Sequence, residues 1–139
     1  MLRWINIWPP FLGAGIRVRW CSNRAVDVEM KLRPWNRNYV GTHYGGSLYS
    51  MTDPFYMLML MENLGRGYIV WDKAASIRFR KPGKGKVKAE FRLTDAQLDA
   101  IRDKLMTQEK YDATFLVEVK DEVGEVVAEV QKVIHIRRK

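Results

Sequence analysis

Cysteine and histidine are scarce in this chain. The single cysteine among 139 residues, Cys21, excludes an intrachain disulfide and a cysteine-based zinc site. The two histidines, His43 and His135, are distant in sequence and lack carboxylates at ligand spacing, so we predict no metal site. Because its neighbours alternate like a strand, Cys21 is predicted to be a buried structural thiol in a reducing, cytoplasmic setting.

Long hydrophobic runs are also missing. The first 16 residues contain Trp4, Trp8 and Phe11, but Pro9-Pro10 interrupts them, and the stretch is too short to span a bilayer. No apolar run leads into a small-residue cleavage site, which argues against a signal peptide. We predict a leading helical segment over 1–15 that ends near the prolines and packs on the domain. The segment has little charge for a polar face, so we expect no stable membrane insertion.

The net charge is +8, from 24 Lys and Arg against 16 Asp and Glu. A basic surface attracts anions. Much of the charge, however, falls at alternate strand positions and in the tail 137–139, as is typical of solvated outer faces. No nucleic-acid motif or stacking platform accompanies it, so we predict no nucleic-acid partner. With 47% apolar and 29% charged residues, the chain is expected to form a single globular domain, 1–139.

Hydrophobic periodicity predicts strands separated by two helices. Strands are expected over 16–32, 68–80, 86–93, 113–119 and 126–136. Ser22-Asn23 either bends or bulges the first of these or divides it into two strands. Thr94 and Gln97 form a capping box that opens a short helix.

The segment 47–64 is apolar nearly all round and is closed by Gly65, which indicates a core helix wrapped by a sheet. Pro54 inside it removes a backbone hydrogen bond, so a kink beside Asp53 is expected. Because the strands run together instead of alternating with helices, the predicted class is α+β with a curled antiparallel sheet.

Residues 38–53 hold the pattern most relevant to chemistry. Gly45-Gly46 leads into the start of the central helix, where unpaired N–H groups can polarise a carbonyl oxygen. Asp53 lies seven residues beyond Gly46, about two helical turns, and is expected to point to the side of the helix start. A carboxylate in an apolar helix is costly without a function or a partner, so Asp53 is the candidate catalytic group.

This segment resembles the PaaI-type hotdog thioesterases, which hydrolyse acyl-CoA thioesters. Asn38, Gly41, Gly45, Gly46 and Asp53 fall at the positions of that family's pattern. The Trp-Asp-Lys stretch at 71–73 is shared with a functionally uncharacterised branch of the superfamily. The resemblance implies a hotdog fold, a homodimer or homotetramer, and no cofactor beyond the CoA of the substrate. It leaves the acyl chain and its carrier, CoA or acyl carrier protein, open.

The resemblance also implies roles for individual residues. Asp53 would activate water as general base or attack directly, and the Gly45 N–H would polarise the thioester carbonyl. Asn38 would orient the water or the carbonyl group. The positions expected to bind substrate are His43, Tyr44, Gly46, Lys81 and Pro82.

An alternative function is a binding protein on the same scaffold that holds an acyl group or CoA without turnover. The family histidine normally precedes Gly-Gly directly, where this chain has Tyr44, and Lys81 stands where some relatives have Ser or Thr. Asp72-Lys73, in an otherwise apolar strand, suggests a buried ion pair or an interface.

Overall fold

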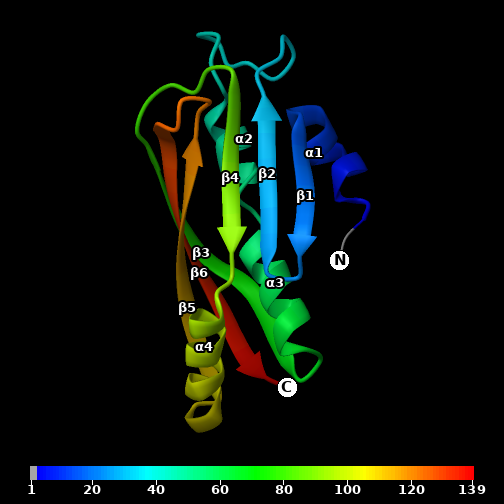
Figure 1. Ribbon diagram of the computed structural model, residues 1–139, viewed down its shortest axis with the longest axis vertical. Coiled ribbons are helices and arrows are strands. Elements are labelled where there is room, and N and C mark those ends of the chain that lie inside the picture. Colours follow the sequence, from blue (N-terminus) through cyan, green and yellow to red (C-terminus); the bar gives the residue numbers. More distant parts are fainter. Residues whose placement is uncertain (1–2) are drawn as a thin grey trace.

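A computed structural model describes residues 3–139. Six strands form one sheet in the order β1-β2-β4-β5-β6-β3, and every neighbouring pair is antiparallel (Figure 1). The strands are β1 (Ile16–Ser22), β2 (Ala25–Lys31), β3 (Tyr68–Phe79), β4 (Lys86–Arg92), β5 (Lys110–Lys120) and β6 (Val126–Arg138).

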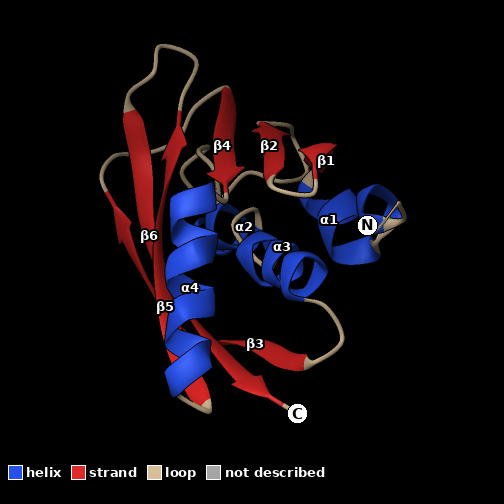
Figure 2. Ribbon diagram, turned by 60° about the horizontal axis from the view of Figure 1, so that its bottom comes forward, coloured by secondary structure: helices blue, strands red, loops and turns tan. Residues whose placement is uncertain are grey.

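The sheet curls around two consecutive helices, α2 (Gly45–Ser50) and α3 (Phe55–Leu64), as Figure 2 shows. Apolar side chains of these helices, among them Leu48, Phe55 and Leu60, are buried against the inner faces of the strands. The predicted α+β class, with a curled antiparallel sheet around a central helix, is confirmed. The predicted capping box is also present, and it opens α4 (Asp95–Thr107).

The central helix is interrupted where the kink was expected. The α2 helix ends at Ser50, a turn follows in which the Asp53 N–H donates to the Ser50 carbonyl at 3.2 Å, and α3 begins at Phe55. Pro54, joined to Asp53 by a cis peptide bond, has no N–H to continue the helical ladder. Asp53 therefore lies in a turn between two helices and not on a continuous helical face.

The prediction that the leading helix ends near the prolines is wrong. A short 3-10 turn, η1 (Ile5–Ile7), comes first, and α1 (Pro9–Ala14) begins at Pro9. Proline suits the first helical turn because its missing N–H would be unpaired there in any case. Residues 1–2 of the predicted segment lie outside the described residues.

Cys21 is exposed, so the prediction of a buried thiol is wrong. The segment 16–32 forms two strands joined by a hairpin, and Ile16 and Val18 fill the inner face of β1. Cys21 has the opposite parity and lies on the outer face, where its Sγ is 3.5 Å from Asp27 Oδ2. Among residues 3–139, no helix has the length and apolar character needed to cross a membrane.

Candidate functional site

A buried lysine interrupts the apolar inner face of β6. Val130, Ile134 and Ile136 point into the core at alternate positions, and Lys132 takes the place between them. Its side chain is 0% exposed. Because a buried ammonium is costly without a charged partner, the surroundings of Lys132 identify the polar centre of the fold.

The ammonium group joins side chains from three other elements. Lys132 Nζ donates to Asp53 Oδ1 at 3.1 Å, lies 3.0 Å from Asp72 Oδ1 and approaches the Tyr49 hydroxyl at 3.4 Å. The Tyr49 ring also offers its face to the ammonium, with the centroid 5.2 Å away. We call these four residues the Lys132 cluster. It ties the α2–α3 turn to β3 and β6.

Charges in the cluster compensate one another. Burial alone would lower the pKa of Lys132, but the Asp53 and Asp72 carboxyls outweigh it and the pKa is raised. The pKa of Asp72 is raised, chiefly by burial of its carboxyl group. Lys132 acts to lower this pKa, and the neighbouring Asp53 carboxyl acts to raise it further. The Lys132 ammonium thus forms ion pairs with two carboxyl groups.

Of the charged side chains in the cluster, Asp53 is the most accessible. Its side chain is 45% exposed, against 23% for Asp72 and 0% for Lys132. Asp53 is thus held by a rigid cation on its inner side and open on its outer side. A carboxylate fixed in this way can meet a water molecule or a substrate while its orientation is maintained.

The loop before α2 is organised by Asn38. Its side-chain amide donates to Thr42 Oγ1 at 2.9 Å and to the His43 carbonyl at 3.3 Å. Its Oδ1 accepts the N–H groups of Val40 and Thr42 at 3.1 and 2.9 Å. The contacts of Asn38 in the structure therefore lie within the loop, and its role toward water or the thioester carbonyl stays a prediction.

His43 fastens this loop to the turn before β4. The side chain is buried, its backbone N–H donates to the Gly83 carbonyl at 2.9 Å, and Nε2 lies 2.7 Å from the Gly85 carbonyl. Burial lowers the pKa of His43, although the contact with Gly85 opposes this. Because a carbonyl oxygen only accepts, Nε2–H is the donor in the contact with Gly85. This geometry gives His43 a structural contact, and substrate binding by His43 stays a prediction.

At the helix start, the glycines allow close packing of aromatic rings. A Cβ at Gly45 would lie 3.1 Å from the Phe79 ring, and a Cβ at Gly46 would lie 2.5 Å from the Tyr44 ring. Tyr44 itself is exposed beside the first turn of α2. Tyr44 thus directly precedes Gly45 and Gly46, which begin α2, the helix that ends just before the Asp53 turn.

Lys81 and Pro82 lie in the connection from β3 to β4. The Lys81 ammonium is 2.6 Å from Asp121 Oδ2 and also pairs with Glu125, and these contacts raise the pKa of Lys81. Lys81 is thereby engaged with the β5–β6 turn, while Pro82 is exposed. Substrate binding by either residue stays a prediction.

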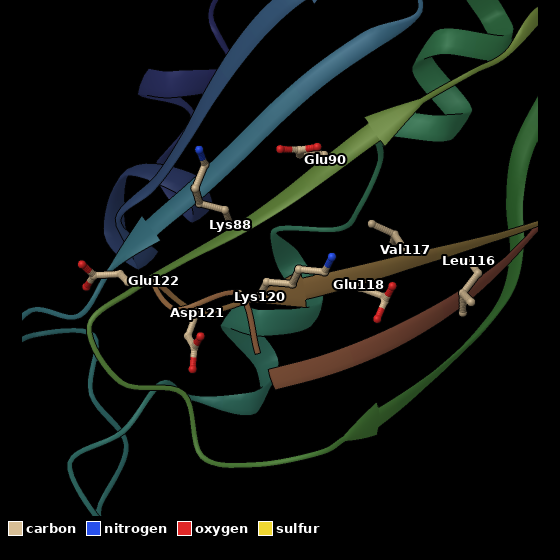
Figure 3. Close-up of a pocket in the computed structure, with 9 residues that line it drawn as sticks. Lys88, Glu90, Leu116, Val117, Glu118, Lys120, Asp121 and Glu122 are labelled. Carbon is tan, nitrogen blue, oxygen red and sulfur yellow. The ribbon is translucent and has the colours of Figure 1, made fainter. Parts of the chain in front are cut away.

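A hollow on the outer face of the sheet is not part of this arrangement. Figure 3 shows it where β4 and β5, paired only at Lys88↔Lys120 and Ala89↔Val119, spread apart. Its volume is about 410 Å³ and charged side chains of both signs, such as Lys88 and Glu118, dominate its lining. None of the lining residues comes from the segment 38–54, and the surface is typical of a solvated sheet face.

Sequence reasoning missed Lys132 and Tyr49 as site residues. The signal for Lys132 is its parity, because a lysine falls at an inward position in the alternating strand Val130–Ile136. Of the Asp72-Lys73 stretch, Asp72 joins a buried ion pair and Lys73 does not. Since successive strand residues face opposite sides, Asp72 meets Lys132 inside, and Lys73 pairs outside with Asp112 at 2.6 Å.

Comparison with protein families gives one match over nearly the whole chain. A family model described as a domain of unknown function, DUF4442, matches residues 2–136. No curated protein matches the sequence.

Several solved structures share the fold. A protein of unknown function from Pseudomonas aeruginosa, described as a probable thioesterase, superposes with a TM-score of 0.83 at 22% identity, covering 96% of this chain and 89% of that one. A putative thioesterase from Shewanella oneidensis gives 0.71 at 18% identity, with 98% and 92% covered. A Haemophilus influenzae thioesterase gives 0.67 at 13% identity, with 93% and 82% covered. The predicted hotdog fold is confirmed by these likenesses.

Proposed function

The chain belongs to the DUF4442 family, and we propose that it hydrolyses an acyl-CoA or related thioester with Asp53 as the catalytic carboxylate. The observation that carries the proposal is the state of Asp53, which is held from inside by the buried Lys132 and is 45% exposed on the other side. Thioesterases among the structures of the same fold support the choice of reaction.

Two routes use the same carboxylate. As general base, Asp53 removes a proton from water, and the resulting hydroxide adds to the thioester carbonyl carbon. As nucleophile, a carboxylate oxygen of Asp53 adds to that carbon, and water later cleaves the mixed anhydride. In both routes the C–S bond breaks, the thiolate leaves and is protonated, and the products are a carboxylic acid and a free thiol.

We assign the backbone N–H of Gly45 to the carbonyl oxygen of the substrate. Gly45 begins α2, so its N–H has no acceptor within the helix. A Cβ at this position would lie 3.1 Å from the Phe79 ring, which would have to shift slightly to admit it. A donor fixed in this way stabilises the oxyanion of the tetrahedral intermediate.

A homodimer formed through β3 is part of the proposal. β3 is an outer strand of the sheet and pairs on one side with β6, whereas its other edge has no strand partner among residues 3–139. Ala74, Ala75 and Phe79 on this strand are exposed. The unpaired edge of this long strand leaves backbone N–H and C=O groups that can hydrogen-bond to another strand. In the proposed homodimer, β3 of a second copy of the chain supplies that strand.

Thiol release from a panel of acyl-CoAs, from acetyl through long-chain and aromatic acyl groups, tests the function. We expect turnover proportional to enzyme concentration with at least one member of the panel. Because Cys21 is an exposed free thiol that a thiol reagent can reach, the assay is best run on the Cys21→Ser variant. Measurable binding of CoA esters without hydrolysis of any of them would contradict the proposal and favour the binding-protein alternative.

A further inference from the structure

Large apolar side chains gather on the outside of the N-terminal segment. Trp4 is 73% exposed, and Trp35, in the loop after β2, is 65% exposed. Ile7, Trp8 and Leu12 are also exposed. We call these five residues the N-terminal apolar surface. Exposed clusters of this kind mark interaction sites in soluble proteins.

The segment that carries this surface is fixed to the sheet. Ile5 and Phe11 are buried, and Phe11 packs against Phe55 with ring centroids 6.1 Å apart. The Asn6 side chain accepts the Val18 N–H at 2.7 Å and donates to the Val18 carbonyl at 3.0 Å. Because these anchors hold the backbone, the exposed side chains are presented outward by a defined structure.

Two adjoining hollows follow the surface. One, of about 510 Å³, is lined by apolar residues that include Trp4, Ile7, Trp8 and Met57. The other, of about 670 Å³, extends from Ile7 and Leu12 to Trp35. Ile7 lines both hollows, so they lie next to each other along the N-terminal segment.

Positive charge borders the second hollow. Arg17, Lys31 and Arg33 line it and are exposed, and the Arg33 guanidinium lies 5.6 Å from the centre of the Trp35 ring. Glu29, the acidic residue of this lining, has Lys86 at 3.5 Å. The second hollow is therefore bordered by an excess of cations, supplied by β1, β2 and the following loop.

We propose that the N-terminal apolar surface docks on an anionic lipid bilayer. Tryptophan side chains favour the interface between headgroups and acyl chains, and the bordering cations match the phosphates of anionic lipids. An excess of positive charge along the rim argues against a second copy of this basic chain as the occupant. The surface adjoins β1, at the opposite end of the sheet from β3 (Figure 1), so pairing through β3 leaves it open.

Docking there has a consequence for the α2–α3 turn. The first hollow is lined also by Pro54, the residue that follows Asp53. A bilayer bound to this surface therefore lies next to the turn that carries Asp53. The binding itself does not depend on catalysis and can be tested in its absence.

The test is sedimentation of the full chain with vesicles of phosphatidylcholine alone or of an equimolar mixture with phosphatidylglycerol. We expect binding about 10- to 100-fold tighter to the anionic vesicles at low salt, weakening as salt is added. The Trp4→Ser/Trp8→Ser variant is expected to lose at least about 10-fold in affinity, and so is Arg17→Gln/Arg33→Gln.

Matched control variants change exposed residues elsewhere. Leu116→Ser removes an exposed apolar side chain from β5, and Lys84→Gln/Lys110→Gln removes two exposed cations. Both controls should bind the anionic vesicles like the original chain. The proposal is overturned if no vesicle sediments the protein, if the tryptophan variant binds unchanged, or if light scattering shows that this variant loses self-association.

Discussion

Replacing Asp53 with asparagine is expected to lower kcat/KM for thioester hydrolysis by about 100-fold or more, the scale of a lost general base. The amide has nearly the same shape, and its oxygen can still accept the hydrogen bond from Lys132 Nζ. It can neither remove a proton from water nor form an anhydride. Because the side chain is half-exposed, we expect the melting temperature to change by a few degrees at most.

The matched control is Asp99→Asn, which neutralises an exposed carboxylate on α4. It changes the net charge by the same amount and should leave kcat/KM unchanged. Initial rates of thiol release and thermal melts on both variants check the prediction. Equal kcat/KM for Asp53→Asn and the original chain would remove Asp53 from the mechanism.

Replacing Lys132 with methionine is expected to lower the free energy of unfolding by about 3 kcal/mol, the low end for removing one partner of a buried ion pair. Methionine retains the apolar stem but leaves the Asp53 and Asp72 carboxyls next to each other without a cation. We take the low end because Asp53 is partly solvated. Urea unfolding at pH 7 measures the change, with Lys88→Met, at an exposed strand position, as control.

The pH dependence identifies the cause of this loss. The pKa of Lys132 is raised in the folded protein above its ordinary 10.5, so its stabilising effect is complete below pH 10.5 and is lost as pH rises through the folded pKa. The difference in unfolding free energy between the original chain and Lys132→Met should therefore be constant near neutral pH and shrink above pH 10.5. A Lys132→Met variant as stable as the original chain at pH 7 would contradict the account of the cluster.

Much of the fold could be predicted because local patterns carry it. Alternation of apolar residues placed the inner faces of β4 and β5, and the capping box placed the start of α4. Proline in the sequence does not by itself tell the end of a helix from its start, and Pro9 occupies the first turn of α1, where proline is tolerated. Cys21 is exposed because it alternates in β1 with the inward-facing Ile16 and Val18, and the usual burial of free cysteine does not reveal this.

The candidate site could be predicted only in part. The glycines and Asp53 stand in one short segment, so sequence spacing reveals them. Lys132 and Asp53 are separated by 79 residues in the sequence, and His43 and Gly85 by 42. Both contacts therefore depend on how the strands pair, which local sequence patterns do not specify. A lysine in a basic chain also resembles the many that are solvated, and its inward parity was the one local sign that separated it from them.

The carboxylate of Asp53 is tested most directly by removing it and supplying it again. Thiol release by Asp53→Ala, measured with and without added formate on the best acyl-CoA of the panel, provides this test. We predict a rate lowered by about 100-fold or more without formate and partial recovery that increases with formate concentration, since a small carboxylate can occupy the vacated space beside Lys132. Hydrolysis by Asp53→Ala at the original rate in the absence of formate would contradict the assignment.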